Sequence, residues 1–481
     1  MREQCSVVCL ELPIVGRLVL GSQSWIQAMS AVMRHKLRER EESGERIKVG
    51  VIGAGVFSCL TIGQIARMPG IATSIIADIY EDKAIRAFTR FARRKPGEIV
   101  KVNDADAANA CMEKSVPVIT TDSRVLLESD VDVILESTGV PEAAARHAYE
   151  AIDRKKNLVM ATVEAESVVG ALFSKMAQER GVVYSQAYGD QPAVICELYD
   201  WAVSSGFKVV AAGEGTAARL EWRHRSPDDA LQRFGFTQEE IERLRLNPKM
   251  YNSFIDTTKC AVEMVAVCNA TGLRPDVRGM HFPLGSREDV PKLLSLKEEG
   301  GILENEGIVD VITRVRPDGE QIANDIRWGV FVVVTTDSED TRGLFKTYEL
   351  FRGAGGKNAL VYRPHHLSGL EASISLIRAV LYSEPTGAPL PTAPSAEVLA
   401  AAKRTLRPGD LLDGGGGYAV YGLAEKADIA REQNLLPLAL AENIRVKREI
   451  PCDGVVSYDD VELNEDAFLL KLRREQDRIF Y

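Results

Sequence analysis

Three residues near the middle of the chain could carry out proton transfer together. Asp256, Lys259 and Glu263 fall at positions i, i+3 and i+7, which places them on one face of a helix about one turn apart. A lysine flanked by carboxylates on an interior face suits carbonyl reduction, because its ammonium group polarises the carbonyl while a carboxylate relays protons. A solvated ladder of salt bridges is the alternative, and spacing alone favours it. An apolar stripe over residues 253–271 predicts the helix.

The first half of the chain holds the pattern of a dinucleotide-binding turn. Residues 47–52 form an apolar strand that runs into Gly53 and Gly55, and Asp78 follows the next apolar strand. Glycines let the backbone approach a pyrophosphate, which helix N-terminal amides then hold. The Asp78 carboxylate can accept hydrogen bonds from ribose hydroxyls and would repel a 2′-phosphate, so NAD is expected and NADP is the second candidate. A strand-to-helix turn that binds nothing is the alternative.

Strands and helices are expected to alternate from residue 47 to residue 184, which predicts a parallel sheet with helices on both faces. The expected strands are 47–52, 73–79, 116–120, 131–136, 157–161 and 181–184, and the expected helices are 55–67, 82–92, 122–128, 141–153 and 167–178. Ligands of such sheets lie beyond the carboxyl ends of the strands, so the segments 136–139, 161–166 and 188–192 are candidate sites. The expected cofactor contacts are Gly53, Gly55, Val56, Phe57, Asp78, Thr138, Gly139 and Glu164.

Six segments carry recognisable motifs, namely residues 136–142, 158–166, 247–259, 270–273, 327–333 and 362–371. Together they resemble the homoserine-dehydrogenase-like oxidoreductases with a C-terminal SAF module, a family that has a 1-deoxy-D-xylulose 5-phosphate reductoisomerase-like branch. The resemblance runs from about residue 30 to about residue 465. It implies an Asp and a Lys on the catalytic helix, which makes Asp256 and Lys259 catalytic candidates rather than members of a solvated ladder.

One position departs from this family. In the relatives, the strand that ends here at Gly213 runs into Gly-Lys-Gly, whereas this chain continues with Glu214, Gly215 and Thr216. Glu214 reverses the charge at a position expected to face substrate. Glu214 therefore disfavours a phosphorylated or strongly anionic substrate. It favours a different specificity or a loss of activity. The expected substrate contacts are Glu214, Thr216, Asn252, Arg363 and His366.

The expected architecture is an α/β protein with a Rossmann dinucleotide-binding domain, an α+β catalytic and dimerisation domain, and a small β-clip SAF domain. The expected parts are an N-terminal extension with a lead-in helix (1–45), the dinucleotide-binding domain (46–206, completed by a helix within 362–383), the catalytic domain (207–361), a linker (384–396), the SAF domain (397–463) and a C-terminal helix (464–481). In sialic-acid synthases a SAF module helps to cover a partner subunit's active site, so the resemblance implies a lid or an oligomer contact.

Composition narrows the partners and the compartment. A net charge of −10 argues against nucleic acid and anionic membranes as partners. The eight cysteines lack zinc-binding spacing, which indicates free thiols in a reducing cytoplasm and no metal. No apolar run reaches the roughly 18 residues needed to span a bilayer, and no signal peptide is visible. We expect a cytoplasmic homodimer or higher homo-oligomer with a small-molecule substrate.

These features predict an NAD-dependent oxidoreductase that acts on a small polar hydroxy or carbonyl compound related to a sugar or sugar acid. In this interpretation Lys259 engages the reacting oxygen, with Asp256 and Glu263 as orienting or proton-relay partners. Two alternatives stay open. One is a reductoisomerase-like enzyme that makes 2-C-methyl-D-erythritol 4-phosphate with NADPH. The other is a cofactor-binding sensor or regulatory protein without catalysis, which Glu214 keeps open.

Overall fold

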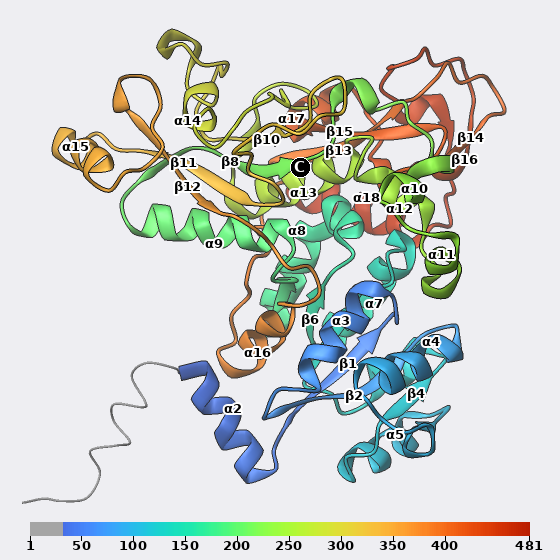
Figure 1. Cartoon of the computed structure of the whole chain (residues 1–481). Coiled ribbons are helices and arrows are strands. Elements are labelled where there is room, and N and C mark those ends of the chain that lie inside the picture. Colours follow the sequence, from blue (N-terminus) through green and yellow to red (C-terminus); the bar gives the residue numbers. More distant parts are fainter. Residues whose placement is uncertain (1–31) are drawn as a thin grey trace, which may run out of the picture.

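The dinucleotide-binding part is built on a seven-stranded sheet in the computed structural model, which describes residues 32–481 (Figure 1). The strand order is β3-β4-β2-β1-β5-β6-β7, and all neighbouring strands are parallel. The order reverses between β1 and β5, which is where a doubly wound sheet binds its ligand. The strands are β1 (Ile47–Ile52), β2 (Ile71–Ala77), β3 (Val100–Lys101), β4 (Val118–Thr120), β5 (Val133–Glu136), β6 (Asn157–Met160) and β7 (Tyr184–Gln186).

Helices cover both faces of this sheet. Successive residues of β5 point to opposite faces, so Val133 and Leu135 join one apolar core and Ile134 joins the other. The helices are α2 (Val32–Ser43), α3 (Val56–Ile65), α4 (Glu81–Arg86), α5 (Ala105–Glu113), α6 (Ser123–Glu128), α7 (Pro141–Asp153), α8 (Val163–Arg180), α9 (Gln191–Ser204) and α16 (Ser373–Leu381). The α/β dinucleotide-binding fold predicted from the sequence is thereby confirmed.

Three elements of this part, β3, α5 and α9, were not among the predicted strands and helices. Strand β3 is only two residues long and exposed, and α5 is rich in alanine, so neither shows a strong apolar period. Asp104 starts α5 by accepting a hydrogen bond from the Ala107 amide at 2.8 Å. The predicted lead-in helix is described from Val32 onward as α2, and the expected extension over residues 1–24 lies outside the described residues.

A separate mixed sheet forms the second part, with the strand order β12-β11-β8-β10-β9. Helices α9 and α13 contact its strands, and α13 also contacts α8 of the first part. The strands are β8 (Lys208–Thr216), β9 (Arg274–Pro275), β10 (Ile308–Thr313), β11 (Val330–Thr335) and β12 (Asn358–Arg363). The helices are α10 (Ala230–Arg233), α11 (Gln238–Leu244), α12 (Pro248–Ser253), α13 (Thr258–Thr271), α14 (Val290–Leu293) and α15 (Glu339–Thr347).

The predicted single helix over residues 253–271 is interrupted. Helix α12 ends at Ser253 and α13 begins at Thr258, because Thr257 adopts a left-handed conformation with φ of 72° that no α-helix tolerates. The break changes the direction of every side chain that precedes it.

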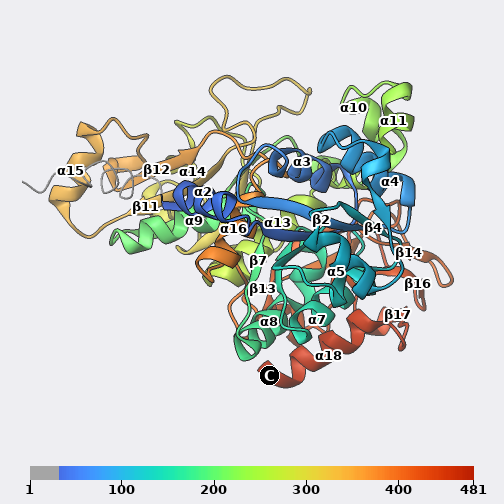
Figure 2. The same ribbon diagram turned by 90° about the horizontal axis from the view of Figure 1, so that it is seen from below.

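A C-terminal module of short antiparallel strands follows residue 395. Helix α18 at its end packs against α7 and α8 (Figure 2), where Glu142 accepts hydrogen bonds from the amides of Phe468 and Leu469 at 2.7 and 2.9 Å. Across residues 32–481, no helix combines the length and apolar character needed to cross a membrane. The elements are β13 (Ala396–Ala402), β14 (Leu411–Asp413), β15 (Val420–Lys426), α17 (Ala427–Glu432), β16 (Glu442–Val446), β17 (Val461–Glu462) and α18 (Phe468–Phe480).

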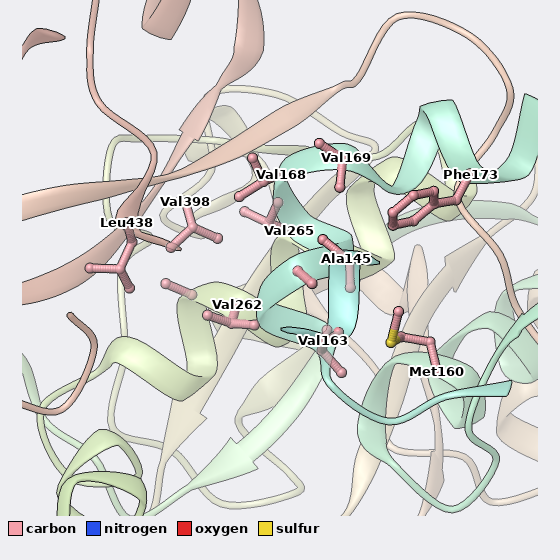
Figure 3. Packing of buried hydrophobic residues seen from close by; sticks show 14 of the residues in the cluster. Ala145, Met160, Val163, Val168, Val169, Phe173, Val262, Val265, Val398 and Leu438 are labelled. Carbon is pink, nitrogen blue, oxygen red and sulfur yellow. The ribbon is translucent and has the colours of Figure 1, made fainter. Parts of the chain in front are cut away.

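One apolar core joins the three parts. Val168 of α8, Val262 and Val265 of α13, and Val398 of β13 belong to a single buried cluster, which Leu438 extends into the C-terminal module (Figure 3). Burying these side chains stabilises the protein by roughly 1.5–3 kcal/mol each. The shared core fixes α13 relative to both the dinucleotide-binding part and the C-terminal module.

Candidate active site

The turn after β1 leaves an open cradle. Gly53 has φ of 92°, and a Cβ there would lie 2.8 Å from the backbone oxygen of Ser137, so only glycine fits. A Cβ at Gly55 or at Gly139 would have no neighbouring atom within 4 Å. These two glycines therefore border space rather than protein, as a bound pyrophosphate and nicotinamide ribose require.

Asp78 lies at the end of β2, beside this cradle. Its Oδ2 accepts a hydrogen bond from the Ala54 amide at 2.7 Å, and its Oδ1 accepts one from the Tyr80 amide at 2.8 Å. The neighbouring side chains of Ile79 and Tyr80 are 77% and 52% exposed. A carboxylate for the ribose and exposed apolar surface for the adenine fit a dinucleotide.

Two hydroxyls shape the other end of the cradle. Buried Glu136 accepts hydrogen bonds from the hydroxyls of Thr138 at 2.6 Å and Thr162 at 2.5 Å. The Thr162 hydroxyl in turn accepts the Gly139 amide at 3.0 Å. Val56 and Phe57, also expected to contact the cofactor, are the first two residues of α3. Val56 is half-exposed and Phe57 is partly buried.

Lys259 lies in the first turn of α13 with its side chain only 9% exposed. Its Nζ is 3.5 Å from Oε1 of Glu164 and 3.6 Å from Oε1 of Glu263. Burial alone would lower the pKa of Lys259, but the charges of Glu164, Glu263 and Asp190 raise it above its usual value. Lys259 is therefore an ammonium group at neutral pH.

A pair of buried carboxyl groups stands behind the lysine. Burial raises the pKa of Glu214 to about 7, and burial together with the charge of Glu214 raises the pKa of Glu263 well above its usual value. Oε2 of Glu214 and Oε1 of Glu263 are both buried and lack a hydrogen-bond partner within the described part of the chain. The pair can therefore hold a proton next to Lys259.

The structure gives Glu164 and Glu214 different surroundings from those expected. Glu164, predicted to contact the cofactor, lies beside the ammonium group of Lys259. Glu214, predicted to oppose an anionic substrate, is only 2% exposed. Its carboxyl group lies against that of Glu263. Glu214, which replaces the lysine of the relatives, therefore belongs to the lysine cluster, the group formed by Lys259, Glu164, Glu214 and Glu263.

The prediction that Asp256 shares a helix face with Lys259 is wrong. Asp256 precedes α13, is fully buried, and forms an ion pair with Lys403 of the C-terminal module at 2.6 Å. Its other oxygen accepts the Thr258 amide at 3.1 Å. The positive φ of Thr257 turns Asp256 away from the face that carries Lys259 and Glu263.

The other expected substrate contacts divide into two groups. Thr216 borders the cluster, where its hydroxyl accepts the Cys260 thiol at 3.3 Å. The Nδ1 of His366 lies 2.6 Å from the Trp328 carbonyl oxygen, and burial lowers the pKa of His366 while the charge of Asp190 opposes that shift. Asn252 and Arg363 have protein partners instead: Asn252 donates to the Gly416 carbonyl at 2.9 Å, and Arg363 pairs with Glu371.

Two residues of this region received no role from the sequence, although one of them, Asp190, lies in the candidate segment 188–192. Asp190, directly before α9, acts on Lys259 and His366 through its charge, and its Oδ1 accepts the Ser368 hydroxyl at 2.9 Å. The rule that ligands lie beyond strand ends marks this position. Lys403 has no such signal, because it lies 147 residues from its partner Asp256.

Two further features lie outside the lysine cluster. A cavity of about 790 Å³ beyond the end of β8 is lined by Arg287, Arg314 and Arg327 and by Asp325, whose carboxylate lies 3.8 Å from Arg314 and 3.7 Å from Arg327. The Nε of Arg314 is buried without a hydrogen-bond partner among residues 32–481. A surface group of His224, Cys452 and Asp453 has donor atoms within 4.8 Å of one another. Its carboxylate already accepts the Tyr421 hydroxyl and pairs with Arg223, which fits an ion-pair cluster.

Comparison with known proteins supports a redox enzyme. A family model described as the catalytic domain of the oxidoreductase DRL matches residues 189–372, a segment shorter than half the chain. This segment contains Asp190, Glu214, Lys259, Glu263 and His366. Residues 189–372 are therefore similar to the catalytic domain of an oxidoreductase. The match does not extend to the homoserine-dehydrogenase-like, SAF or reductoisomerase-like assignments, which stay predictions.

Solved structures give only remote similarity. A probable dehydrogenase from Thermotoga maritima is 13% identical with a TM-score of 0.37, over 70% of this chain and 90% of that one. GenD2 from gentamicin A biosynthesis, in complex with NAD, is 13% identical with a TM-score of 0.36, over 71% and 88%. A putative myo-inositol dehydrogenase from Sinorhizobium meliloti 1021 is 9% identical with a TM-score of 0.36, over 70% and 90%. No curated protein sequence matches the chain.

Proposed function

We propose that the protein transfers hydride between NAD and a hydroxyl-bearing or carbonyl carbon of a small, polar, sugar-like compound. The observation that carries the proposal is the buried ammonium group of Lys259, held between two carboxylates. A cavity of about 120 Å³ is lined by Gly139 and Glu164, by Thr258 of α13 and by residues of the C-terminal module, so Glu164 is the part of the lysine cluster that borders it. We propose that the substrate binds beside Glu164, between the cofactor cradle and the Lys259 ammonium group.

The lysine cluster provides the proton chemistry. NAD, when bound, supplies or accepts hydride at the substrate carbon. In the reducing direction the Lys259 ammonium donates a hydrogen bond to the carbonyl oxygen and then gives it a proton as negative charge develops there. The Glu263 and Glu214 pair shares a proton that it can return to Lys259, because burial raises the pKa of both groups. In the oxidising direction the same groups act in reverse.

NAD is proposed over NADP because of Asp78. Its carboxylate lies where the adenosine ribose is expected, and both its oxygens are oriented by backbone amides. A 2′-phosphate at that position would meet a fixed negative charge, which costs binding free energy unless a cation intervenes.

A phosphorylated or carboxylated sugar is the second candidate substrate, and one observation favours it. The cavity that Arg287, Arg314 and Arg327 line begins where β8 and β10 end, since the Arg314 amide donates to the Thr216 carbonyl at 3.0 Å. Arginine groups bind phosphate and carboxylate strongly. The reductoisomerase-like alternative belongs to this candidate and requires NADPH, which Asp78 disfavours.

The test is a cofactor titration followed by a substrate screen. NADH should bind at least about tenfold more tightly than NADPH, which corresponds to about 1.4 kcal/mol. Polyols, sugar acids and sugar phosphates are then assayed for turnover with the preferred cofactor. Turnover of a neutral polyol supports the first candidate, and turnover of only phosphorylated sugars supports the second. NADH binding without turnover of any compound would overturn the proposal in favour of a sensor.

A further inference from the structure

A buried lysine of the C-terminal module holds the backbone just before the catalytic helix. The Nζ of Lys403, whose side chain is 2% exposed, donates to Oδ2 of Asp256 at 2.6 Å. It also donates to the carbonyls of Arg225 at 2.7 Å and Gly417 at 2.6 Å. All three donors of the ammonium group are used, so one side chain ties together the module, the segment before α12 and the start of α13.

Asp256 passes this restraint to the first turn of α13. Its Oδ1 accepts the Thr258 amide at 3.1 Å and thereby satisfies one of the free amides of the helix N-terminus. Burial raises the pKa of Asp256, and the charge of Lys403 opposes that shift. Among residues 32–481, Lys403 is the charged group that pairs with this carboxylate.

The backbone between Asp256 and Lys259 is strained. Thr257 has φ of 72°, a left-handed conformation that a β-branched residue rarely adopts, and its hydroxyl is buried without a partner among the described residues. Such a conformation persists only where its surroundings impose it. Contacts with the module restrain the chain on both sides of Thr257. Lys403 pairs with Asp256 on one side, and the Gly422 amide donates to the Thr258 hydroxyl at 2.9 Å on the other.

We propose that Lys403 is a positioning residue for Lys259 and that the C-terminal module is therefore part of the catalytic unit. The inference rests on the proposed role of Lys259. Lys403 fixes Asp256, Asp256 fixes the first turn of α13, and this turn aims the Lys259 ammonium group at Glu164 and the substrate space. Without Lys403 the strained turn relaxes, and Lys259 moves away from its reactive position while the cofactor cradle on β1 and β2 stays intact.

The experiment compares two buried ion pairs of the same module. Lys403→Met breaks the pair with Asp256, and Arg473→Met breaks the pair between Arg473 and Glu397, whose atoms are 2.8 Å apart. The Arg473 side chain is 9% exposed, and its partners are Glu397 and Asp477, which lie outside the segment before Lys259. Lys403→Met with Asp256→Asn removes both charges and keeps a folded protein measurable if the single variant unfolds.

Three readouts are taken on the full chain. In Lys403→Met and in the double variant, kcat should fall about 10-fold to 100-fold while the Kd of NADH changes less than about twofold, since only the lysine is misplaced. Backbone amide exchange in residues 252–262 should accelerate without cofactor or substrate. Arg473→Met should lower Tm but leave kcat and this local exchange near their wild-type values.

Two results would overturn the inference. One is a wild-type kcat and wild-type exchange at residues 252–262 in a folded Lys403→Met or double variant. The other is an equal loss of kcat in Arg473→Met, which would mean that general destabilisation explains the effect. Failure of the proposed function is distinguishable, because it would appear as full activity of Lys259→Met, whereas amide exchange tests the restraint by Lys403 without turnover.

Discussion

Two buried lysines on either side of one helix turn have opposite surroundings. Lys403 makes three contacts at 2.6–2.7 Å, each to an acceptor that orients it. Lys259 has its two carboxylate partners at 3.5 and 3.6 Å, and oxygens of the nearby carboxyl groups lack hydrogen-bond partners within residues 32–481. Buried polar groups nearly always have a hydrogen-bond partner. The carboxyl oxygens without a partner therefore mark the place where a ligand or a proton is accommodated.

The comparison separates a structural ion pair from a reactive one. A buried charge is tolerated when it is paired and hydrogen-bonded. Removal of one partner leaves the other charge buried and unpaired, which strongly destabilises the fold. Lys403 and Asp256 meet that description. Lys259 instead sits among Glu164, Glu263, Glu214 and Asp190, which give the cluster more negative than positive charge unless protons are held there. Burial raises the pKa of Glu263, and the charges of Glu214 and Asp190 raise it further.

The largest expected effect is on stability. Lys403→Met leaves the Asp256 carboxylate buried and unpaired, so the free energy of unfolding should fall by about 3–5 kcal/mol. Lys259→Met removes a cation whose carboxylate neighbours can take up protons, and the loss should be below about 2 kcal/mol. Urea denaturation of both variants measures the difference. Equal losses would contradict the distinction between the two lysines.

The next effect is on proton transfer. Glu263→Gln keeps the shape of a protonated glutamate but cannot relay a proton to Lys259, so kcat should fall about 100-fold. NADH binding should stay unchanged, because Glu263 lies on α13 and away from the glycine cradle. Steady-state kinetics with a cofactor titration checks both values. Glu179→Gln on the exposed end of α8 is the matched control.

A smaller effect should appear in the pH dependence of stability. Burial raises the pKa of Glu214 and of Glu166 from 4.5 to about 7 in each case. A carboxyl with a raised folded pKa stabilises the protein fully below the unfolded pKa, and this contribution is lost as pH rises through the folded pKa. Stability should therefore decline between about pH 4.5 and pH 7, by about 1–3 kcal/mol for each group.

Substitution by glutamine removes this titration. Thermal denaturation of Glu214→Gln and Glu166→Gln across the same pH range should show a flatter Tm profile than the wild type. An unchanged slope in both variants would contradict the raised pKa values. Glu166 is the internal comparison, because its oxygens accept hydrogen bonds from Gln186 and Tyr184 rather than facing Lys259.

The smallest predicted effect concerns cofactor choice. Asp78→Ser removes the fixed charge at the ribose position, so kcat/KM with NADPH relative to NADH should rise about tenfold, or about 1.4 kcal/mol. Asp106→Ser changes net charge equally at an exposed position on α5 and serves as the control. If the two variants gave the same cofactor ratio, Asp78 would not be the ribose ligand.

Local sequence patterns predicted the cofactor half of the site. The glycines at 53 and 55 and the acid at 78 are signalled by short-range spacing between a strand, a turn and a second strand, and the sheet order agrees with that interpretation. Helical spacing likewise brought together Lys259 and Glu263, whose charged atoms lie 3.6 Å apart. Such features depend on neighbours within a few residues, which is why sequence alone suffices.

Tertiary contacts decided the rest. Asp256 has helical spacing from Lys259, but a positive φ at Thr257 breaks the helix, and no propensity of threonine signals that conformation. The strain is imposed by Lys403 and Gly422 of a module that begins more than a hundred residues later. The surroundings of Glu214 likewise depend on packing between β8 and α13, so its charge could be read from the sequence but its raised pKa could not.

The central claim is that Lys259 is the proton donor and acceptor of the reaction. The direct test measures two quantities in Lys259→Met. One is the Kd of NADH, and the other is the rate of single-turnover hydride transfer with the substrate identified in the screen, detected by nicotinamide absorbance. We expect an unchanged Kd for NADH and a transfer rate at least about 1000-fold lower, because both the proton and the charge at the substrate oxygen are lost. Hydride transfer at the wild-type rate in a folded Lys259→Met protein would contradict it.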